Sequence, residues 1–198
     1  MPKKIWIPLS LILLVLVIMM SCVGKAPAPG QSYNKAYHDS IDKIKLDTFI
    51  TNHPILAGIP INPSKIIKDS SGSGLRYLIV SDTSTQKKYL PNGFSNVTFS
   101  YSIRVLGKSG IVDSIPNGVS TGGYNINPLS STFTGLVQGI EHIHQGGHIL
   151  LFIPSSIAFQ DQAVDLSYTH LDQTVTLYTI PPNSVLVYNL TLTSVLPY

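Results

Sequence analysis

The sequence contains a single cysteine, Cys22, among its 198 residues. A chain with one cysteine cannot form an internal disulfide, so a disulfide-stabilised fold is excluded. Charged residues are also few, at 12% of the chain. The sequence has no basic cluster of the kind that predicts a nucleic-acid partner, and no acidic run of the kind that predicts a solvating tail. A G-x-S-x-G pattern occurs at Gly118-Val119-Ser120-Thr121-Gly122, but it lies in a segment rich in Gly, Pro, Asn and Ser and not between a strand and a helix, so it does not predict the nucleophile turn of a serine hydrolase.

The longest apolar run lies near the N-terminus. Lys3 and Lys4 precede an uncharged, largely apolar stretch over residues 5–20. This stretch is shorter than the roughly 20 residues that a helix needs to cross about 30 Å of hydrocarbon. Positive residues followed by a short apolar run are typical of a secretory signal peptide. Residues 1–21 are therefore predicted to be a targeting segment and not part of the fold.

The end of this run, Met19-Met20-Ser21-Cys22, resembles the lipobox of bacterial lipoproteins, in which a small residue precedes the lipidated cysteine. Met19 stands where such boxes usually carry Leu. The resemblance implies cleavage before Cys22 and a lipid on its thiol. The mature protein would then be anchored to a membrane on its periplasmic or cell-surface side. A plain signal peptide with a chance thiol and an uncleaved anchor are the alternatives.

The predicted mature chain is nearly neutral. Removing Lys3 and Lys4 from the 13 basic residues leaves 11, against 10 acidic ones, so its net charge is near +1. Residues 22–32 contain Ala26-Pro27-Ala28-Pro29-Gly30, which cannot pack into a core and is expected to be an extended linker. The remaining residues are enough for one domain with a short extension.

Residues 33–52 show the spacing of a helix, with Tyr37, Ile41, Ile44 and Phe49 near one face. Asn52-His53-Pro54 predicts its end, because the residue before a proline is disfavoured in the α conformation. Residues 33–74 are thus expected to form an N-terminal helix and a connecting segment.

From residue 75 the pattern changes to strands. We expect strands over residues 75–80, 97–105, 111–113, 149–153, 175–180 and 185–195, with a short extended segment at 124–126. One helix is predicted over residues 133–144, ended by Gly146-Gly147. Strands with one short helix between them predict an α+β domain with an antiparallel sheet over residues 75–198.

Three segments within this region follow one another in a characteristic order. They are Val97-x-Phe99-x-Tyr101 with Gly110-x-Val112-Asp113-Ser114, then Phe133-Thr134-Gly135-Leu136 through Gly146-Gly147 to Leu151-x-Ile153-Pro154, and last Ile180-Pro181-Pro182-Asn183-Ser184 through Tyr188. Together they resemble the FKBP-type peptidyl-prolyl cis-trans isomerases over about residues 75–195.

The resemblance implies a twisted antiparallel sheet wrapped around a short helix, with a substrate pocket between them. It assigns catalytic positions to Tyr101, Asp113, Phe159 and Tyr188, and substrate-binding positions to Val112, Thr132, Phe133, Leu136 and Ile180. In the family, Val112 is usually Phe, Leu136 is Trp, Thr132 is Val or Ile, and Gln160 is Gly. The loop over residues 160–179 also looks altered, so the rim of the pocket is expected to differ.

The implied function is isomerisation of X–Pro bonds in exported proteins, with proline-containing polypeptides as substrates. Such catalysis needs no metal or other cofactor, because an apolar pocket that favours the twisted amide suffices. Losing aromatic area at Val112 and Leu136 would weaken it. The alternative is therefore a catalytically weak or inactive FKBP-like binding or chaperone module in a membrane-associated assembly.

His142-x-His144 with His148 is a competing signal for a metal site. An H-x-H pair on a strand presents both rings to one face, whereas residues two apart on a helix point away from each other. Because the spacing over residues 133–143 favours a helix, we expect these histidines to lie solvated on its surface.

Overall fold

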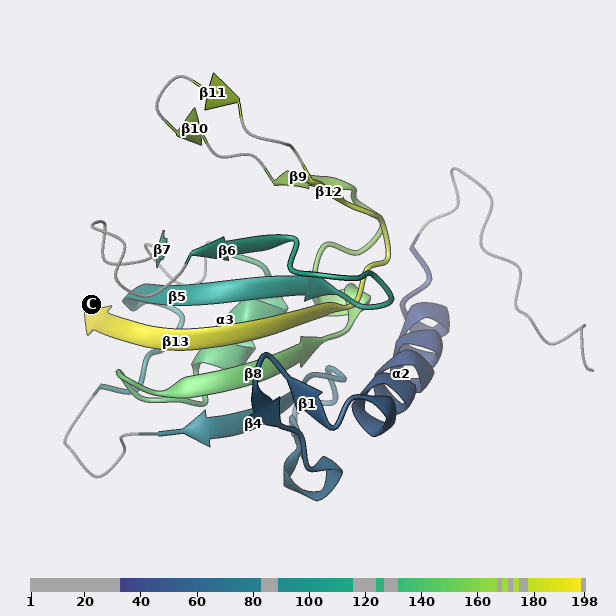
Figure 1. The fold of residues 1–198 in the computed structure, drawn as a ribbon, viewed down its shortest axis with the longest axis horizontal. Coiled ribbons are helices and arrows are strands. Elements are labelled where there is room, and N and C mark those ends of the chain that lie inside the picture. The colour runs from purple at the N-terminus through teal and green to yellow at the C-terminus, as the bar shows by residue number, and fades with distance from the viewer. Residues whose placement is uncertain are drawn as a thin grey trace, which may run out of the picture. The chain divides into compact units, whose positions relative to one another are not determined.

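The computed structural model describes residues 33–82, 89–115, 124–126, 132–166, 169–170, 173–174 and 178–196. The predicted signal peptide, Cys22 and the linker lie outside these residues. The elements in chain order are α2 (Lys35–Asn52), β1 (Ile55–Leu56), β2 (Ile59–Pro60), η1 (Pro63–Lys65), β3 (Ile67–Lys68), β4 (Arg76–Ser81), β5 (Asn96–Val105), β6 (Asp113–Ile115), β7 (Tyr124–Ile126), α3 (Thr134–Ile140), β8 (His148–Ile153), η3 (Ser155–Ile157), β9 (Val164–Leu166), β10 (Thr169–His170), β11 (Gln173–Thr174), β12 (Tyr178–Ile180) and β13 (Leu186–Leu196). Figure 1 shows their arrangement.

Seven of the described strands form one antiparallel sheet, in the order β3-β4-β8-β13-β5-β6, with β7 also paired to β5. The long strand β13 lies in the middle of this sheet. Tyr188 on β13 is opposite Ile103 of β5 on one side and Leu151 of β8 on the other. The predicted α+β class, with an antiparallel sheet and one short helix, is confirmed.

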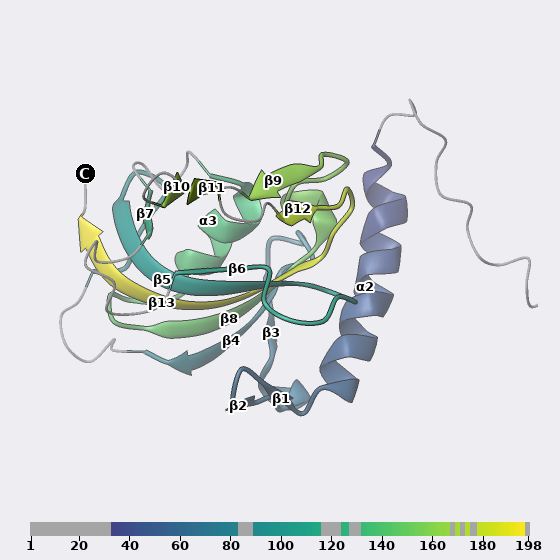
Figure 2. The ribbon, with the colours of Figure 1, turned by 45° about the horizontal axis from the view of Figure 1, so that its top comes forward.

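One face of the sheet curves around α3 (Figure 2). Because successive side chains of a strand point to opposite faces, every second residue of the central strands is directed toward this helix. The resulting inner cluster contains buried residues of six elements and the loops beside them: Leu75, Tyr77, Val97, Phe99, Ile103, Val105, Leu136, Ile140, Ile143, Ile149, Leu151, Ile153, Ile180, Leu186, Tyr188, Leu190, Leu192 and Val195. The clean alternation over residues 97–105 therefore predicts the correct buried face of β5.

The other face of the sheet is covered by α2 and the segment after it. Leu46 and Ile50 of α2 pack with Leu78, Phe152 and Val187 of the sheet. The outer cluster also includes Leu56, Ile61, Leu150 and Val185. The central strands are thus buried on both faces, which explains why residues 149–153 form a continuous apolar run.

The helix over Lys35–Asn52 is where the sequence predicts one, but its buried face differs from the prediction. The buried residues are His38, Asp42, Leu46 and Ile50. Ile44, placed on the buried face from the sequence, is 66% exposed. Two of these four buried side chains, His38 and Asp42, are polar, so a search for apolar spacing alone selects the wrong face.

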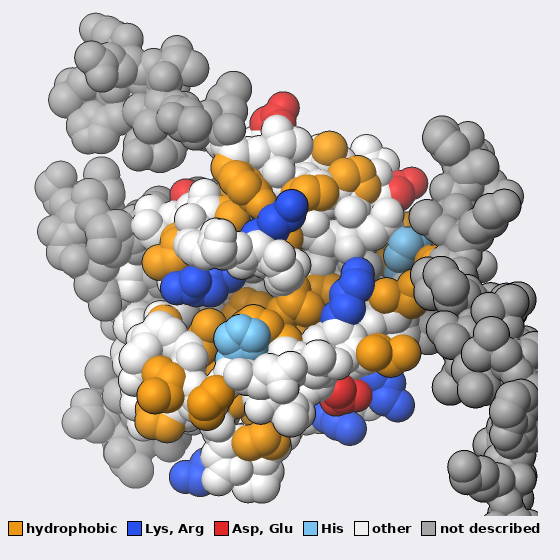
Figure 3. All heavy atoms as spheres, turned by 45° about the vertical axis from the view of Figure 1, so that its right-hand side comes forward, with side chains coloured by type: hydrophobic (Ala, Val, Ile, Leu, Met, Phe, Trp, Pro, Cys, Tyr) orange, Lys and Arg blue, Asp and Glu red, His pale blue; other side chains and the backbone are white. Residues whose placement is uncertain are grey.

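Exposed hydrophobic side chains are distributed over the surface. Figure 3 shows them in several places on the face that it presents, with Lys and Arg side chains between them. Scattered apolar side chains of this kind are ordinary on folded proteins. Among the described residues, no helix is both long and apolar enough to cross a membrane.

Two predicted boundaries are wrong. The helix α3 ends at Ile140 and not at His144, because the chain turns there to enter β8. The Gly146 N–H donates to the Leu192 carbonyl at 2.6 Å, which draws residues 141–147 toward β13. The strand predicted over residues 111–113 is instead Asp113–Ile115, since the Val112 N–H closes the preceding turn on the Ile103 carbonyl at 2.8 Å. Residues 175–177 of another predicted strand lie outside the described residues.

Gly135 lets α3 approach the sheet closely. A Cβ atom on this residue would lie 2.3 Å from Ile153 Cγ2 and 2.9 Å from the Ile157 carbonyl oxygen. Real side chains do not approach so closely, so either α3 or the η3 turn would have to move. The spacing between α3 and the η3 turn therefore depends on the absence of a side chain at residue 135.

We predict that Gly135→Ala lowers the free energy of unfolding by about 1–3 kcal/mol, as overpacking of a core usually does. Urea denaturation followed by circular dichroism would measure it. Thr134→Ala, at the exposed first residue of the same helix, is the control and should change stability by less than about 0.5 kcal/mol. Equal stability of the Gly135→Ala variant and the wild type would contradict this close packing.

Candidate functional site

Four aromatic side chains from four parts of the chain meet on the inner side of the sheet. Tyr101 lies on β5, Phe133 precedes α3, Phe159 follows η3, and Tyr188 lies on β13. The ring centroids of Phe133 and Phe159 are 4.8 Å apart, in an edge-on arrangement. Tyr188 lies 6.1 Å from Phe133 and 5.9 Å from Tyr101. We call these four residues the aromatic group.

The sheet register produces this meeting. Tyr101 and Tyr188 both belong to the inward-facing set of their strands, and Leu190 is the residue directly opposite Tyr101. The two tyrosines are therefore diagonal neighbours on one face of an antiparallel pair, close enough for aromatic rings to touch. Tyr188 is only 5% exposed, whereas Tyr101 is half-buried.

Asp113 is attached to this group by a hydrogen bond. The Tyr101 hydroxyl donates to Asp113 Oδ2 at 2.7 Å. Asp113 is the first residue of β6, which pairs with β5, and it lies opposite Ile103. A carboxylate at the edge of an apolar surface can accept a hydrogen bond from a backbone N–H of a bound peptide, while the tyrosine keeps it oriented.

The remaining predicted site residues lie around the aromatic group. Leu136 is 3% exposed and Ile180 is fully buried, and both belong to the inner cluster. Val112 is half-buried and packs against the same cluster. Thr132 is half-buried and lies next to Phe133 in the chain. The structure thus brings eight of the nine predicted residues to one side of the sheet, with Thr132 placed only by its position next to Phe133, and their roles stay predictions.

The turn that carries Phe159 has an unusual backbone. Gln160 has φ +54°, in the left-handed region where glycine is favoured. Gln160 stands where the family resemblance expects Gly, so a non-glycine residue here adopts a backbone conformation that favours glycine. Hydrogen bonds help to keep it, since Gln160 Nε2 donates to the Ser156 carbonyl at 3.2 Å and the Gln160 carbonyl accepts from the Asn183 N–H at 2.6 Å.

The altered loop after Phe159 contains short strand pairs. β9 pairs with β12, and β10 pairs with β11, each antiparallel. Val164 and Leu166 of β9 and Tyr178 of β12 pack against the inner cluster. Figure 1 shows β10 and β11 beyond the main sheet. The loop is therefore attached to the core through β9 and β12, and the altered rim of the pocket stays a prediction.

The three histidines contact different partners. His142 Nε2 lies 3.0 Å from Asp69 Oδ1 and its ring stacks on Tyr77. His148 Nε2 lies 2.5 Å from Asn189 Oδ1. The prediction of solvated histidines on a helix is wrong, because all three follow the end of α3 and are only partly exposed. No cluster of three potential metal ligands occurs among the residues that the structure describes.

The third histidine, His144, and the carboxyl group of Asp69 also take part in polar contacts near the end of α3. His144 Nδ1 lies 3.0 Å from Asp82 Oδ2. A hydrogen bond from the Ser71 hydroxyl is the main cause that holds the pKa of Asp69 below its usual range, with His142 acting in the same direction and burial opposing it. These contacts connect the β3–β4 region to the turn before β8, and no residue of the aromatic group takes part in them.

A separate hollow of about 350 Å³ lies between α2 and the β3–β4 region. It is lined by Asp39, Lys43, Leu46, Lys68, Asp69, Gly72, Gly74, Leu75, Arg76 and Pro154. Both charge signs are present in its walls, and no residue of the aromatic group contributes to it.

Two residues near the site were missed from the sequence. Asp42 of α2 and Ser155 of η3 are both buried, at 1% and 0% exposure, and their side chains are hydrogen-bonded to each other. The available signal was the spacing of Asp42 by four residues from His38 and from Leu46. A polar residue within a buried stripe usually has a specific partner.

The comparisons with known proteins agree with this fold. The structure is similar to that of FkpA from Escherichia coli, with a TM-score of 0.53 and 20% identity over 95% of this chain and 70% of that one. It is also similar to a peptidyl-prolyl cis-trans isomerase from Pseudomonas syringae pv. tomato, with a TM-score of 0.52 and 17% identity over 84% of this chain and 98% of that one. No protein-family model and no curated protein sequence matches the chain. The FKBP-like fold that the three sequence segments predict is confirmed.

We predict that the left-handed backbone at residue 160 sets which side chains are tolerated beside Phe159. Gln160→Val should lower the free energy of unfolding by about 1–3 kcal/mol, because a β-branched side chain is strained at positive φ. Gln160→Gly is the matched control, and urea denaturation should find it close to the wild type. If Gln160→Val were as stable as Gln160→Gly, this turn could not have the described conformation.

Proposed function

We propose that this chain is a peptidyl-prolyl cis-trans isomerase that is attached to a membrane by a lipid on Cys22 and assists the folding of exported proteins. The observation that carries the proposal is the aromatic group with Asp113, placed on the inner side of an FKBP-like sheet. The likeness of this chain's fold to that of the isomerase from Pseudomonas syringae pv. tomato supports the same activity.

The chemistry of the reaction suits such a site. Rotation about a peptide bond costs about 18–20 kcal/mol because the C–N bond is partly double. Only X–Pro bonds populate both isomers appreciably, and their uncatalysed exchange takes tens to hundreds of seconds. A surface that is complementary to the twisted amide lowers this barrier without forming any covalent bond. Aromatic walls suit this task, because proline packs against their faces and water is excluded.

Each member of the site has a distinct part in this proposal. Phe133, Phe159 and Tyr188 hold the proline ring, and Leu136 forms the floor beneath it. Asp113 accepts a hydrogen bond from the substrate backbone and is oriented by Tyr101. Since a twisted amide is less conjugated, this environment favours it over both planar isomers.

The second candidate function is a binding or chaperone module with little or no catalysis. Leu136 and Val112 favour it, because they replace aromatic residues expected from the family resemblance. A Leu side chain has less area to hold a proline ring than an indole. Binding of proline peptides without faster isomerisation is the behaviour that separates this candidate from the first.

We predict that the purified chain in detergent accelerates isomerisation of an X–Pro tetrapeptide in a protease-coupled assay. Asp113→Ala should lower kcat/KM roughly ten- to hundredfold, the equivalent of losing one hydrogen bond to a charged group, about 1.5–3 kcal/mol. Asp47→Ala, on α2 and bonded to Arg76, is the control and should keep the wild-type rate.

Two results would decide against parts of this account. A folded wild-type protein that leaves the isomerisation rate unchanged excludes the enzyme and favours the binding module. Wild-type activity in the Asp113→Ala variant excludes the assigned role of Asp113. Circular dichroism of each variant establishes that the fold is retained.

We further predict that a labelled fatty acid is incorporated at Cys22 in bacterial cells. Cys22→Ala should abolish labelling, because the thiol that accepts the lipid is lost. Ser21→Ala keeps a small residue before the cysteine and should retain labelling. Unchanged labelling of the Cys22→Ala protein would exclude the proposed anchor.

A further inference from the structure

The side chain of Asp42 lies buried between α2 and the turn that leads to Phe159. It is 1% exposed. Its Oδ2 atom accepts two hydrogen bonds from Ser155, one from the backbone N–H at 2.8 Å and one from the hydroxyl at 2.6 Å. Burying a carboxylate is costly unless such donors replace water, so both partners are held firmly in this arrangement.

Ser155 in turn holds the backbone on both sides of Phe159. Its carbonyl accepts from the Ala158 N–H at 3.2 Å and from the Gln160 N–H at 3.0 Å. Phe159 lies between these two residues and contacts Phe133 of the aromatic group. A displacement of Ser155 would therefore move both backbone neighbours of Phe159.

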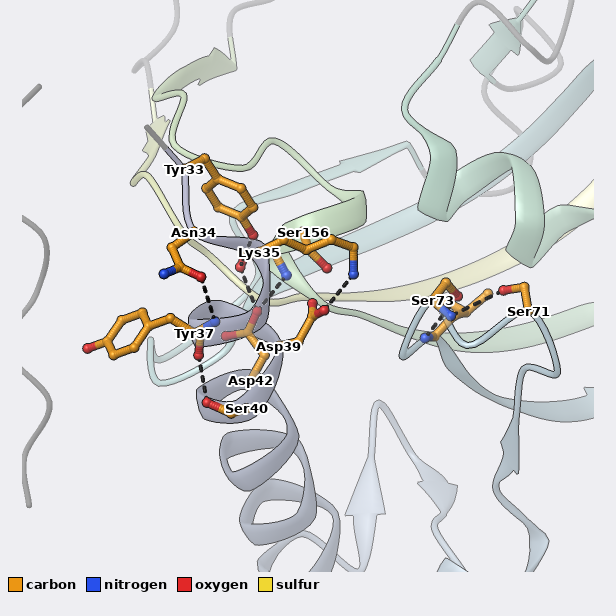
Figure 4. A network of polar contacts seen from close by, with 12 residues as sticks. Tyr33, Asn34, Lys35, Tyr37, Asp39, Ser40, Asp42, Ser71, Ser73 and Ser156 are labelled. Atoms are coloured by element: carbon orange, nitrogen blue, oxygen red, sulfur yellow. Dashed lines mark hydrogen bonds and ion pairs between the residues drawn. The ribbon is translucent and has the colours of Figure 1, made fainter. Parts of the chain in front are cut away.

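The start of α2 adds a second contact to the same serine. The Ser155 hydroxyl donates its proton to Asp42, so the Tyr33 hydroxyl is the donor in the 3.3 Å contact between Tyr33 and Ser155. The ring of Tyr33 stacks on His38, with centroids 4.7 Å apart. Figure 4 shows Tyr33, Asp42 and Ser156 where the first turns of α2 meet this region.

The turn itself needs such external support. Gln160 has φ +54°, a conformation that persists in a non-glycine residue only when its surroundings enforce it. On one side the Asn183 N–H donates to the Gln160 carbonyl. On the other side, Asp42 holds Ser155, to which the Gln160 N–H is bonded.

We propose that Asp42 is a positioning residue, which acts through Ser155 to hold Phe159 against Phe133 and so makes α2 part of the site. The proposal rests on the function proposed above, in which Phe159 forms a wall for the substrate proline. Asp42 itself lies on the buried face of α2, with Leu46 and Ile50, and its hydrogen bonds are to Ser155 and not to a residue of the aromatic group. Its effect is mechanical, since it fixes the backbone that carries a wall of the pocket.

The test compares three variants of the full chain in detergent. Asp42→Ala removes the acceptor. Asp42→Asn keeps one oxygen, which can occupy the place of Oδ2 and accept both hydrogen bonds. Asp47 lies on the same helix as Asp42 and forms a 2.6 Å ion pair with Arg76 of β4. Asp47→Ala breaks this pair and serves as the control for a general loosening of α2.

Two readouts are needed, one of which does not depend on activity. NMR measures the cross-relaxation between the Phe159 and Phe133 rings and the hydrogen exchange of the Ala158 and Gln160 amides. Asp42→Ala should weaken the ring contact and speed exchange of both amides, whereas Asp42→Asn and Asp47→Ala should match the wild type. In the isomerase assay, Asp42→Ala should lower kcat/KM about tenfold or more, as expected when a site residue is misplaced.

Each outcome decides a different point. Wild-type ring contacts and exchange rates in folded Asp42→Ala overturn the proposal, and so do equal changes in Asp42→Ala and Asp47→Ala. If Asp42→Ala does not fold, Ser155→Ala replaces it, because it keeps the backbone donor and removes only the hydroxyl. That variant should show a smaller change of the same kind. Ring contacts and exchange rates equal to those of the wild type would overturn the proposal. An inactive wild type with the predicted NMR changes refutes the proposed function but not the positioning by Asp42.

Discussion

The structure depends on the burial of β13 on both of its faces. This strand lies between β8 and β5, with Leu186, Tyr188 and Leu190 directed toward α3, and Val187 directed toward α2. Hydrogen bonds to two neighbours fix its register, and a shift by one residue would exchange its inner and outer side chains. The site and the N-terminal helix are therefore built on opposite faces of one strand.

This arrangement explains how residues that are distant in sequence form one aromatic group. Tyr101 and Tyr188 are diagonal neighbours on adjacent strands, and α3 carries Phe133 to them because Gly135 allows close packing. Phe159 is held less directly, on a turn with a left-handed residue. The buried pair of Asp42 and Ser155 restrains this turn from the opposite side.

Much of the fold could be predicted because its patterns are local. The alternation over residues 97–105 reports burial of one face, and the glycine and proline residues around α3 and β13 identify loops. The buried face of α2 could not be predicted in this way. It includes His38 and Asp42, whose partners Tyr33 and Ser155 are recognised only when the tertiary contacts are known. For the same reason, the hydrogen bonds that join Gly146 and Gly147 to Leu192 of β13 could not be read from any local pattern.

The site was predicted as a set of positions, and the structure supplies the contacts between them. The hydrogen bond between Tyr101 and Asp113 and the edge-on contact of Phe133 with Phe159 are tertiary geometry that spacing cannot specify. The most direct test of the central claim is NMR mapping of a proline-containing peptide on the labelled protein. We predict shifts at Tyr101, Phe133, Phe159 and Tyr188, with peptide exchange peaks that show faster isomerisation. Shifts confined to the hollow around Lys43, Lys68 and Arg76 would contradict it.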